Sequence, residues 1–336
     1  MASPERNRGR LALVSGETHP QLAKDIADEL GTKLDPVDLK TFANTENYVR
    51  FQESVRGSDV FVLQSHAAVG GKSVNDAIME QRLLIDAARR GSAREITAVS
   101  PYLAYLRQDR KAKGREPISA SMTIQDLIRS GANRIMSVDL HSEQAQGFIN
   151  GPFDPLIAQE ILTDWIKNWK SENRMKNSGV VLVSPDAGRA ELVQDFAEEV
   201  GVDLAIIDKR RSKETRKAEA TGVLGEVAGR QCIIVDDMID TAGTLAAAAK
   251  MLKEQRAIGV IAIATHGILS NPAAKNIKKS AIDKVVVTDT LPTQEHLERL
   301  GDKLEVVSMA PKIAEAIREV HEEGSVSKVF NGKNAR

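Results

Sequence analysis

The segment 233–244 combines an apolar run with acidic, hydroxyl and small residues, and its residue types could bind a phosphate group. Its first part, 233–235, predicts a buried parallel strand that ends at a pair of aspartates. The alanine-rich run from Leu245 predicts a helix. The amide N–H groups at the start of a helix, together with the positive end of its dipole, favour an anion. We therefore expect an anion site where the strand passes into the helix.

The polar residues of this segment favour a sugar phosphate as the bound anion. Thr241 and Thr244 can donate hydrogen bonds to phosphate oxygens, and Gly243 lets the backbone approach a ligand closely. Asp236 and Asp237 can accept hydrogen bonds from vicinal sugar hydroxyls or hold a hydrated magnesium ion. The alternative is a strand that happens to end in two aspartates before a helix.

Composition limits the class of protein. The chain has 336 residues, which suits two domains, and its hydrophobic content of 42% and charged content of 28% are ordinary for a globular enzyme. A net charge of −1 argues against nucleic acid or a membrane surface as the main partner. Cys232 is the only cysteine, which excludes a disulfide framework and a thiolate zinc site. With no signal-like or membrane-length apolar run, we expect a cytoplasmic protein.

Short apolar runs alternate with amphipathic runs, which predicts an α/β fold with mainly parallel sheets flanked by helices. Strands are expected at 11–15, 59–65, 95–102, 134–140, 180–184, 203–208, 231–236, 259–265, 284–288 and 304–308, and a hairpin at 37–53. The order of the elements in the first half recurs in the second. We therefore predict two tandem domains related by internal duplication, 1–150 and 151–336, with the last ~25 residues packing back on the first. Chance similarity between two α/β halves is the alternative.

Two segments of the first half carry groups suited to phosphate. The segment 71–73, Gly-Lys-Ser, has the ending of a P-loop, but the glycine required five positions earlier is His66, so we expect no P-loop. Arg107 offers a planar fork for phosphate oxygens and can stack on a purine, and Gln108 and Asp109 add polar contacts. This second segment is either a nucleotide site or a solvated charged loop.

Four other residues at predicted strand ends could serve phosphate chemistry. Ligands of open α/β sheets collect at the carboxyl ends of strands, which is where His141 and Asp186 are expected. An imidazole with an oxygen ligand would suit a magnesium ion that bridges ATP phosphates, although a single histidine is more often structural. Lys209 and Arg211 could neutralise charge on a transferring phosphoryl group; the alternative is an ordinary basic loop.

Taken together, these segments resemble class I ribose-phosphate pyrophosphokinase over nearly the whole chain. The matching segments are 42–46, 53–57, 105–111, 117–120, 138–141, 146–148, 184–188, 206–211, 233–244, 265–267 and 325–327. Phosphoribosyltransferases resemble the chain in 233–244 but lack the segments of the nucleotide site. The combination, in this order, is therefore specific for the pyrophosphokinase family.

The resemblance implies two tandem phosphoribosyltransferase-like domains and transfer of the diphosphoryl group of ATP to the 1-hydroxyl of ribose 5-phosphate. The products would be AMP and 5-phosphoribosyl 1-diphosphate (PRPP), for nucleotide, NAD, histidine and tryptophan biosynthesis. The residues implied for ATP are Phe42, Asn44, Thr45, Glu46, Arg107, Gln108 and Asp109. Those implied for ribose 5-phosphate are Arg211, Asp236, Asp237, Asp240, Thr241, Ala242, Gly243 and Thr244. Lys209 and Arg211 would be catalytic, and His141 and Asp186 would hold Mg²⁺, with two ions at work, one arriving with ATP.

The resemblance also implies a homohexamer, in which the 42–46 loop completes a neighbour's ATP site, and regulation by ADP and phosphate. Thr45 and Arg189 stand where the family usually has glycine, Leu106 replaces an alanine, and Ala242 is an accepted variant. We expect Arg189, close to Asp186, to alter metal or effector affinity without removing a catalytic group.

Two other functions fit parts of the sequence. A phosphoribosyltransferase that consumes PRPP would need the same sugar-phosphate segment. A non-catalytic regulatory homologue would bind partners instead, but it would be free to lose Lys209, Arg211 and His141, and this chain keeps them.

Overall fold

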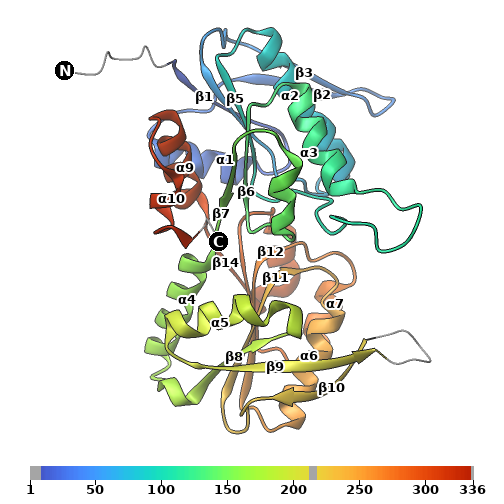
Figure 1. The fold of residues 1–336 in the computed structure, drawn as a ribbon, viewed down its shortest axis with the longest axis vertical. Helices are drawn as coiled ribbons and strands as arrows, with labels where there is room; N and C mark the ends of the chain where they lie inside the picture. Colours follow the sequence, from blue (N-terminus) through green and yellow to red (C-terminus); the bar gives the residue numbers. More distant parts are fainter. Residues whose placement is uncertain (1–8, 212–217, 334–336) are drawn as a thin grey trace, which may run out of the picture. The chain divides into compact units, whose positions relative to one another are not determined.

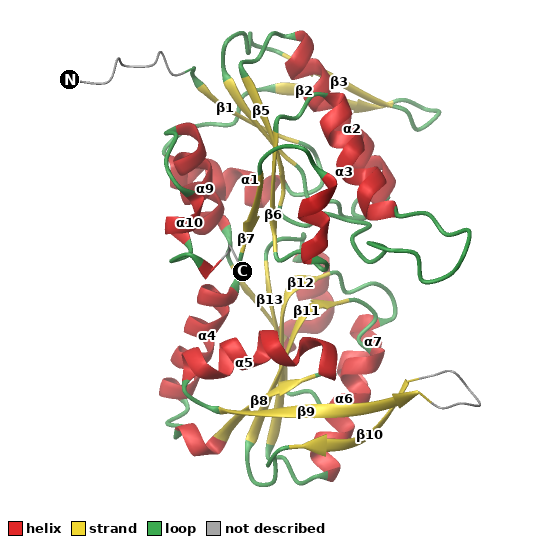
Figure 2. Cartoon of the chain, in the orientation of Figure 1, coloured by secondary structure: helices red, strands yellow, loops and turns green. Residues whose placement is uncertain are grey.

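The chain forms two α/β units, each built around one mainly parallel sheet with helices on both faces (Figures 1 and 2). The computed structural model describes residues 9–211 and 218–333, leaving undescribed the side chains of 209–211 and 218–221. None of the helices in this described part is both long enough and apolar enough to cross a membrane. The predicted fold class is confirmed.

The two units do not divide the chain at a single point. The first runs to Ile157 and also contains Thr290–Pro292 and the chain from Met309 onwards. The second contains Ala158–Asp289 and Thr293–Ser308. The C-terminal segment thus belongs to the same unit as the N-terminal half.

The sheet of the first unit has five parallel strands in the order β1-β4-β5-β6-β7. The strands are β1 (Leu11–Ser15), β4 (Asp59–Leu63), β5 (Glu95–Ser100), β6 (Arg134–Val138) and β7 (Phe153–Leu156). The helices are α1 (Pro20–Leu30), α2 (Val74–Arg90), α3 (Ser119–Ser130), α9 (Ala310–His321) and α10 (Val326–Val329), with a 3₁₀ turn at Glu143–Phe148. Figure 1 shows α2 and α3 on one face of this sheet and α1 and α9 on the other.

The edge of this sheet holds a strand that the sequence pattern missed. β7 pairs with β6 alone and contains Pro155, which lies opposite Ser137. Proline removes an amide donor and is therefore tolerated at a sheet edge, although it breaks the sequence signature of a strand. The hairpin predicted over 37–53 is confirmed as the antiparallel pair β2 (Val37–Thr41) and β3 (Asn47–Phe51).

The sheet of the second unit has seven strands in the order β10-β9-β8-β11-β12-β13-β14, and only β10 is antiparallel to its neighbour. The strands are β8 (Val180–Ser184), β9 (Asp203–Arg211), β10 (Ala218–Leu224), β11 (Gln231–Ile239), β12 (Gly259–Gly267), β13 (Lys284–Thr288) and β14 (Leu304–Val307). The helices are α4 (Gln159–Glu172), α5 (Ala190–Val200), α6 (Gly243–Glu254), α7 (Ala273–Lys279) and α8 (Gln294–Leu300), with 3₁₀ turns at Asn177–Gly179, Ala187–Arg189 and Gly301–Lys303.

The strand order supports the predicted duplication. The series β8-β11-β12-β13-β14 in the second sheet repeats the series β1-β4-β5-β6-β7 in the first. The parallel bridge between Leu13 and Leu34 lies beside β1, as β9 lies beside β8. Both units therefore share one connectivity. The chain that follows the first strand of the series (β1 or β8) pairs on the outer side of that strand, and the chain that follows the second strand (β4 or β11) forms the next strand on the opposite side.

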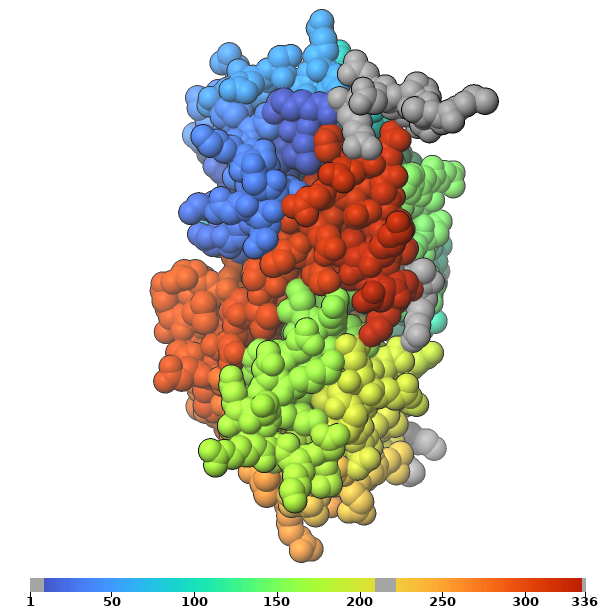
Figure 3. All heavy atoms as spheres, turned by 90° about the vertical axis from the view of Figure 1, so that its left-hand side faces the viewer, coloured from blue at the N-terminus to red at the C-terminus, as the bar shows by residue number. Residues whose placement is uncertain are grey.

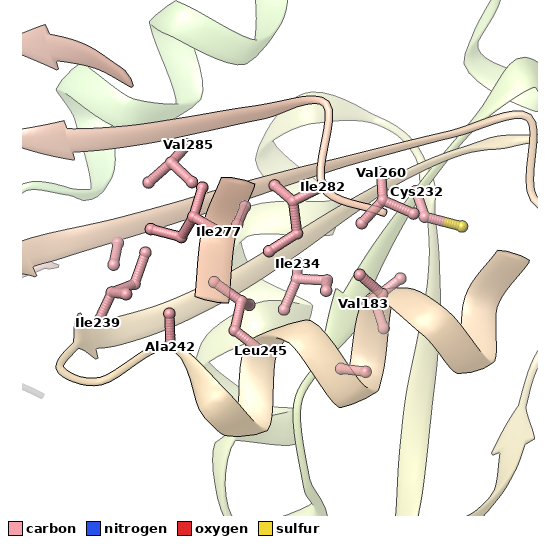
Figure 4. Close-up of a cluster of buried hydrophobic side chains, with 14 of the residues drawn as sticks. Val183, Cys232, Ile234, Ile239, Ala242, Leu245, Val260, Ile277, Ile282 and Val285 are labelled. Atoms are coloured by element: carbon pink, nitrogen blue, oxygen red, sulfur yellow. The ribbon is translucent and has the colours of Figure 1, made fainter. Parts of the chain in front are cut away.

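The core of the second unit lies between the central strands and α6. Figure 4 shows Ile234 of β11 beside Leu245 of α6, and Val260 of β12 belongs to the same cluster. Cys232 lies in the same cluster and is fully buried, and this burial raises the pKa of its thiol to about 12. The thiol therefore stays neutral, as expected for an inert core cysteine.

Buried charge fixes the C-terminal helix within the first unit. Asp59, at the start of β4, accepts a hydrogen bond from Arg94 Nε at 2.8 Å and lies 3.0 Å from Nδ1 of His321 on α9. Arg318 of α9 donates to the carbonyl of Glu29 at the end of α1, at 3.0 Å. Figure 3 shows this C-terminal segment, in red, against α1, in blue. One buried carboxylate thus links β4, the start of β5 and α9.

We expect Asp59→Ala to lower the free energy of unfolding by about 1–3 kcal/mol, because it removes the buried carboxylate that Arg94 and His321 share. Urea unfolding of the intact protein measures this change. The control is Asp86→Ala, which removes the partner of the exposed Arg90 on α2. An equal loss in both variants would contradict a special role for Asp59.

Candidate functional site

The acidic pair lies inside β11 and not after it, so the predicted end of this strand is wrong. β11 continues through Asp236 and Asp237 to Ile239, which pairs with Gly267 of β12. The extension follows from β12, which is equally long and offers backbone partners for the additional residues. The carboxylates are therefore held by the sheet itself, which fixes them better than a loop would.

The start of α6 has the geometry of an anion site. Ala242 is its N-cap residue at a φ of +58° and makes no side-chain cap hydrogen bond, and the first turn holds no acidic residue. Thr241, Gly243 and Thr244 are exposed, while the Ala242 methyl packs in the core. The amides of the first turn have no intrahelical acceptor and can bind an anion from outside. Figure 4 shows Ala242 at this turn, between the end of β11 and α6.

Arg189 reaches the acidic pair from the neighbouring strand-end loop. Its Nη2 lies 2.7 Å from Oδ2 of Asp237, and its Nε lies 3.9 Å from Oδ1 of Asp236. The loop begins at Asp186, which accepts the Gly188 amide at 3.1 Å. Arg189 was expected close to Asp186, and its pairing with the aspartates was not expected. The pairing follows from the adjacency of β8 and β11 in the sheet, for which the sequence carries no signal.

Arg189, the acidic pair and the start of α6 lie at the point where the strand order reverses in the sheet. β8 continues through α5 to β9 on one side, and β11 continues through α6 to β12 on the other. Ligands of open parallel sheets bind at such a switch point, beyond the carboxyl ends of the two strands. The predicted sugar-phosphate residues of segment 236–244 therefore lie where the fold favours a ligand.

Burial changes the charge of the pair. Burial, together with the adjacent Asp237 carboxylate, raises the pKa of Asp236 to about 8, and Arg189 opposes the rise. Asp237 is the more buried of the two, with 7% of its side chain exposed against 30% for Asp236. At neutral pH and without a ligand, the pair therefore shares a proton, and Arg189 balances the remaining charge.

The first unit has a separate polar cavity of about 610 Å³ beyond the ends of β5 and β6. Arg107, Gln108 and Asp109 line it together with His141, so the structure brings these predicted residues to one place. Ser142 donates to Oδ2 of Asp109 at 2.7 Å. The cavity is therefore lined by two acidic groups, Asp109 and Glu116, and by several basic or neutral polar groups.

The wall of this cavity is ordered by side-chain hydrogen bonds. Glu116 accepts the amides of Ala112 and Lys113, both at 2.8 Å, and Ser119 donates to Gln108 at 2.9 Å. These hydrogen bonds order the charged segment, most of whose side chains are exposed.

The other predicted ATP residues lie in the turn of the β2–β3 hairpin, away from this cavity. Thr45 has a φ of +71°, a conformation that favours glycine, and the Phe42 and Glu46 backbones close the turn at 2.8 Å. The amide of Glu46 donates to Asn44 Oδ1 at 3.3 Å. Phe42 is 52% exposed. The structure therefore does not bring Phe42, Asn44, Thr45 and Glu46 together with Arg107.

Two further predictions have different outcomes. The side chains of Lys209 and Arg211 lie outside the described residues, and only their backbone in β9 is described, paired with β10. The absence of a P-loop fits the structure: Lys72 is paired with Glu17 and Glu80, and Ser73 forms the capping box of α2 with Asp76.

Within the described residues, no cluster of three or more histidine, cysteine or acidic side chains could hold a metal ion alone. His141 belongs to the first unit and Asp186 to the second. A Mg²⁺ ion usually takes one or two protein ligands and completes its shell with water and substrate phosphates. The side chains present suit an ion that is bound largely through a nucleotide.

The fold defines an α/β protein in which polar groups gather beyond the carboxyl ends of strands in each unit. Residues 11–131 match the family model of the N-terminal domain of ribose phosphate pyrophosphokinase, and residues 209–331 match the phosphoribosyl synthetase-associated domain. The chain belongs to the ribose-phosphate pyrophosphokinase family.

Named relatives cover nearly the whole chain. The ribose-phosphate pyrophosphokinase of Bifidobacterium longum is 48% identical over 98% of this chain and 94% of its own length. That of Streptomyces avermitilis is 47% identical over 96% of both chains. The crystal structure of phosphoribosylpyrophosphate synthetase from Mycobacterium smegmatis superposes with a TM-score of 0.85 at 45% identity, covering 94% of this chain and 100% of that one.

The raised pKa of Asp236 predicts a pH dependence of stability. Between about pH 4, the ordinary value for aspartate, and pH 8, the folded protein holds a proton that the unfolded chain releases. The free energy of unfolding should therefore fall as the pH rises through this window, by up to about 1.4 kcal/mol per pH unit. Asp236→Asn should remove this contribution and gain stability relative to wild type as the pH rises.

Urea unfolding at pH 5, 6, 7 and 8, without added ligands or metal ions, measures this dependence. Asp164→Asn on the exposed surface of α4 is the control and should follow the wild-type curve. Parallel curves for wild type and Asp236→Asn would show that Asp236 does not hold the proton.

Proposed function

We infer that the protein is a ribose-phosphate pyrophosphokinase, which transfers the diphosphoryl group of ATP to the 1-hydroxyl of ribose 5-phosphate and forms PRPP and AMP. The observation that carries this inference is the acidic pair at the carboxyl end of β11, followed at once by the open amides of α6. This arrangement pairs acceptors for sugar hydroxyls with donors for phosphate. The family relationship supplies the reaction.

We propose that ribose 5-phosphate binds in the second unit. Its 5-phosphate would accept hydrogen bonds from the backbone and hydroxyls of Thr241–Thr244, including the amides of Ala242 and Gly243, and Asp240 would add an acceptor beside the sugar. Its vicinal hydroxyls would donate to Asp236 and Asp237. The exposure of Thr241, Gly243 and Thr244 supports this proposal. Arg211 would add a charged contact to the phosphate.

We propose that ATP binds in the cavity lined by Arg107, Gln108 and Asp109. The arginine fork suits phosphate oxygens or stacking on the purine. The hairpin turn with Phe42, Asn44, Thr45 and Glu46 would complete the ATP site of a neighbouring subunit, which requires an oligomer. The exposed Phe42 supports such a role, and we expect a homohexamer that responds to ADP and phosphate.

In the reaction, the sugar O1 attacks the β-phosphorus in line, the bond from this phosphorus to the α,β-bridging oxygen breaks, and AMP leaves. The O1 proton goes to water as the new O–P bond forms, and among the described side chains none stands out as a general base. Lys209 and Arg211 would stabilise the charge that spreads over the transferring group. His141 and Asp186 would hold Mg²⁺, which supplies further charge neutralisation on the phosphates when bound.

A phosphoribosyltransferase that consumes PRPP is the alternative reaction. The polar cavity of the first unit and the match to the pyrophosphokinase N-terminal domain favour the kinase. A non-catalytic homologue is disfavoured by the retained cationic and acidic residues at the strand ends.

A coupled assay for AMP tests the proposed reaction. The enzyme should release AMP from ATP and Mg²⁺ when ribose 5-phosphate is present and no nucleobase is added, and PRPP should form in equal amount. AMP release that is independent of ribose 5-phosphate, or none under any condition, would overturn the proposal.

We expect Lys209→Ala to lower kcat by about a hundredfold to ten-thousandfold, the scale seen when one charge-stabilising donor is lost. The KM values for both substrates should change far less, because the ammonium acts mainly in the transition state. Steady-state kinetics with Lys167→Ala, on the surface of α4, provide the matched control. A kcat within about threefold of wild type, under about 1 kcal/mol, would exclude Lys209 from catalysis.

A further inference from the structure

Arg189 is built into the acidic pair. Its guanidinium makes one short ion pair to Asp237, at 2.7 Å, and a longer one to Asp236, at 3.9 Å. The side chain is 24% exposed, and the Asp237 carboxylate is 7% exposed. An ion pair this far out of water differs from the exposed pairs of the helix surfaces, because removing one partner leaves a charge that water reaches poorly.

Two adjacent carboxylates at one strand end repel each other and lose hydration. Arginine suits this place because it stays charged at every relevant pH and offers five donors in one plane. A carboxylate has about four lone-pair positions. Asp236 accepts the Asp237 amide on Oδ1 at 2.9 Å and is 30% exposed, so it is the member of the pair that a ligand can reach while Arg189 stays bonded to Asp237.

We propose that Arg189 is a positioning residue for the sugar: it holds Asp237 and balances the charge of the acidic pair, and so sets the affinity for the vicinal hydroxyls of ribose 5-phosphate. This inference rests on the proposed function. Arg189 would supply the positive charge that a bound cation would otherwise provide beside the two carboxylates. Arg189 contacts the acidic pair directly and does not line the cavity proposed for ATP, so its effect should fall on the sugar.

The test is steady-state kinetics of the intact enzyme at saturating ATP and Mg²⁺. Arg189→Met keeps much of the side-chain volume but removes the charge and the donors, and should raise the KM for ribose 5-phosphate about 10- to 100-fold. The KM for ATP should stay within about twofold, and kcat within about threefold, of the wild-type values. Arg189→Lys restores the charge and should bring the KM for ribose 5-phosphate back to within about fivefold.

Arg230→Met is the matched control. Arg230 stands just before β11, at the opposite end from the acidic pair, and its Nη2 also lies 2.7 Å from an aspartate oxygen, that of Asp203. This variant should lower the midpoint of urea unfolding and leave both KM values near wild type. If Arg189→Met does not fold, Arg189→Gln, which keeps N–H donors without the charge, carries the same expectation.

The outcomes separate this inference from the proposed function. If the wild type forms no AMP with ribose 5-phosphate, the proposed function is wrong and the inference falls with it. If the wild type is active but Arg189→Met binds ribose 5-phosphate within about twofold of wild type, only the inference is wrong. Equal increases in both KM values, or the same increase in Arg230→Met, would also overturn it.

Discussion

The site of the second unit depends on two carboxylates near the carboxyl end of β11, which need a positive charge beside them. Asp236 and Asp237 are adjacent, largely withdrawn from water and fixed by the pairing of β11 with β12. Such a pair is costly unless a cation balances it, and Arg189 supplies that charge from the next strand end. The sheet therefore fixes these hydrogen-bond acceptors before a ligand binds. On a flexible loop, the acceptors would have to become ordered on binding.

The same plan occurs twice, but the two copies carry different groups. In the second unit the ligand groups lie at the ends of β8 and β11, at the switch point of the sheet. In the first unit the equivalent end of β4 carries Gln64, which donates to Glu80 and accepts from Thr18. Its polar cavity lies instead beyond β5 and β6. The two units thus share one scaffold and carry different residues at their strand ends.

The sequence predicted much of the fold because alternating apolar and amphipathic runs reflect burial in a parallel sheet. It missed β7, where Pro155 hides an edge strand, and it ended β11 too early, because polar residues within a strand look like its end. It located the segment 236–244 from residue types alone. It could not pair Arg189 with Asp237, because that contact depends on two strands that are neighbours in the sheet but not in the chain.

The measurement that tests this account most directly is a crystal structure of the enzyme with ribose 5-phosphate and a non-hydrolysable ATP analogue. The account predicts the 5-phosphate on the amides at the start of α6 and the vicinal hydroxyls on Asp236 and Asp237, with Arg189 still bonded to Asp237. A sugar bound elsewhere, or Arg189 displaced from the aspartates by the ligand, would contradict it.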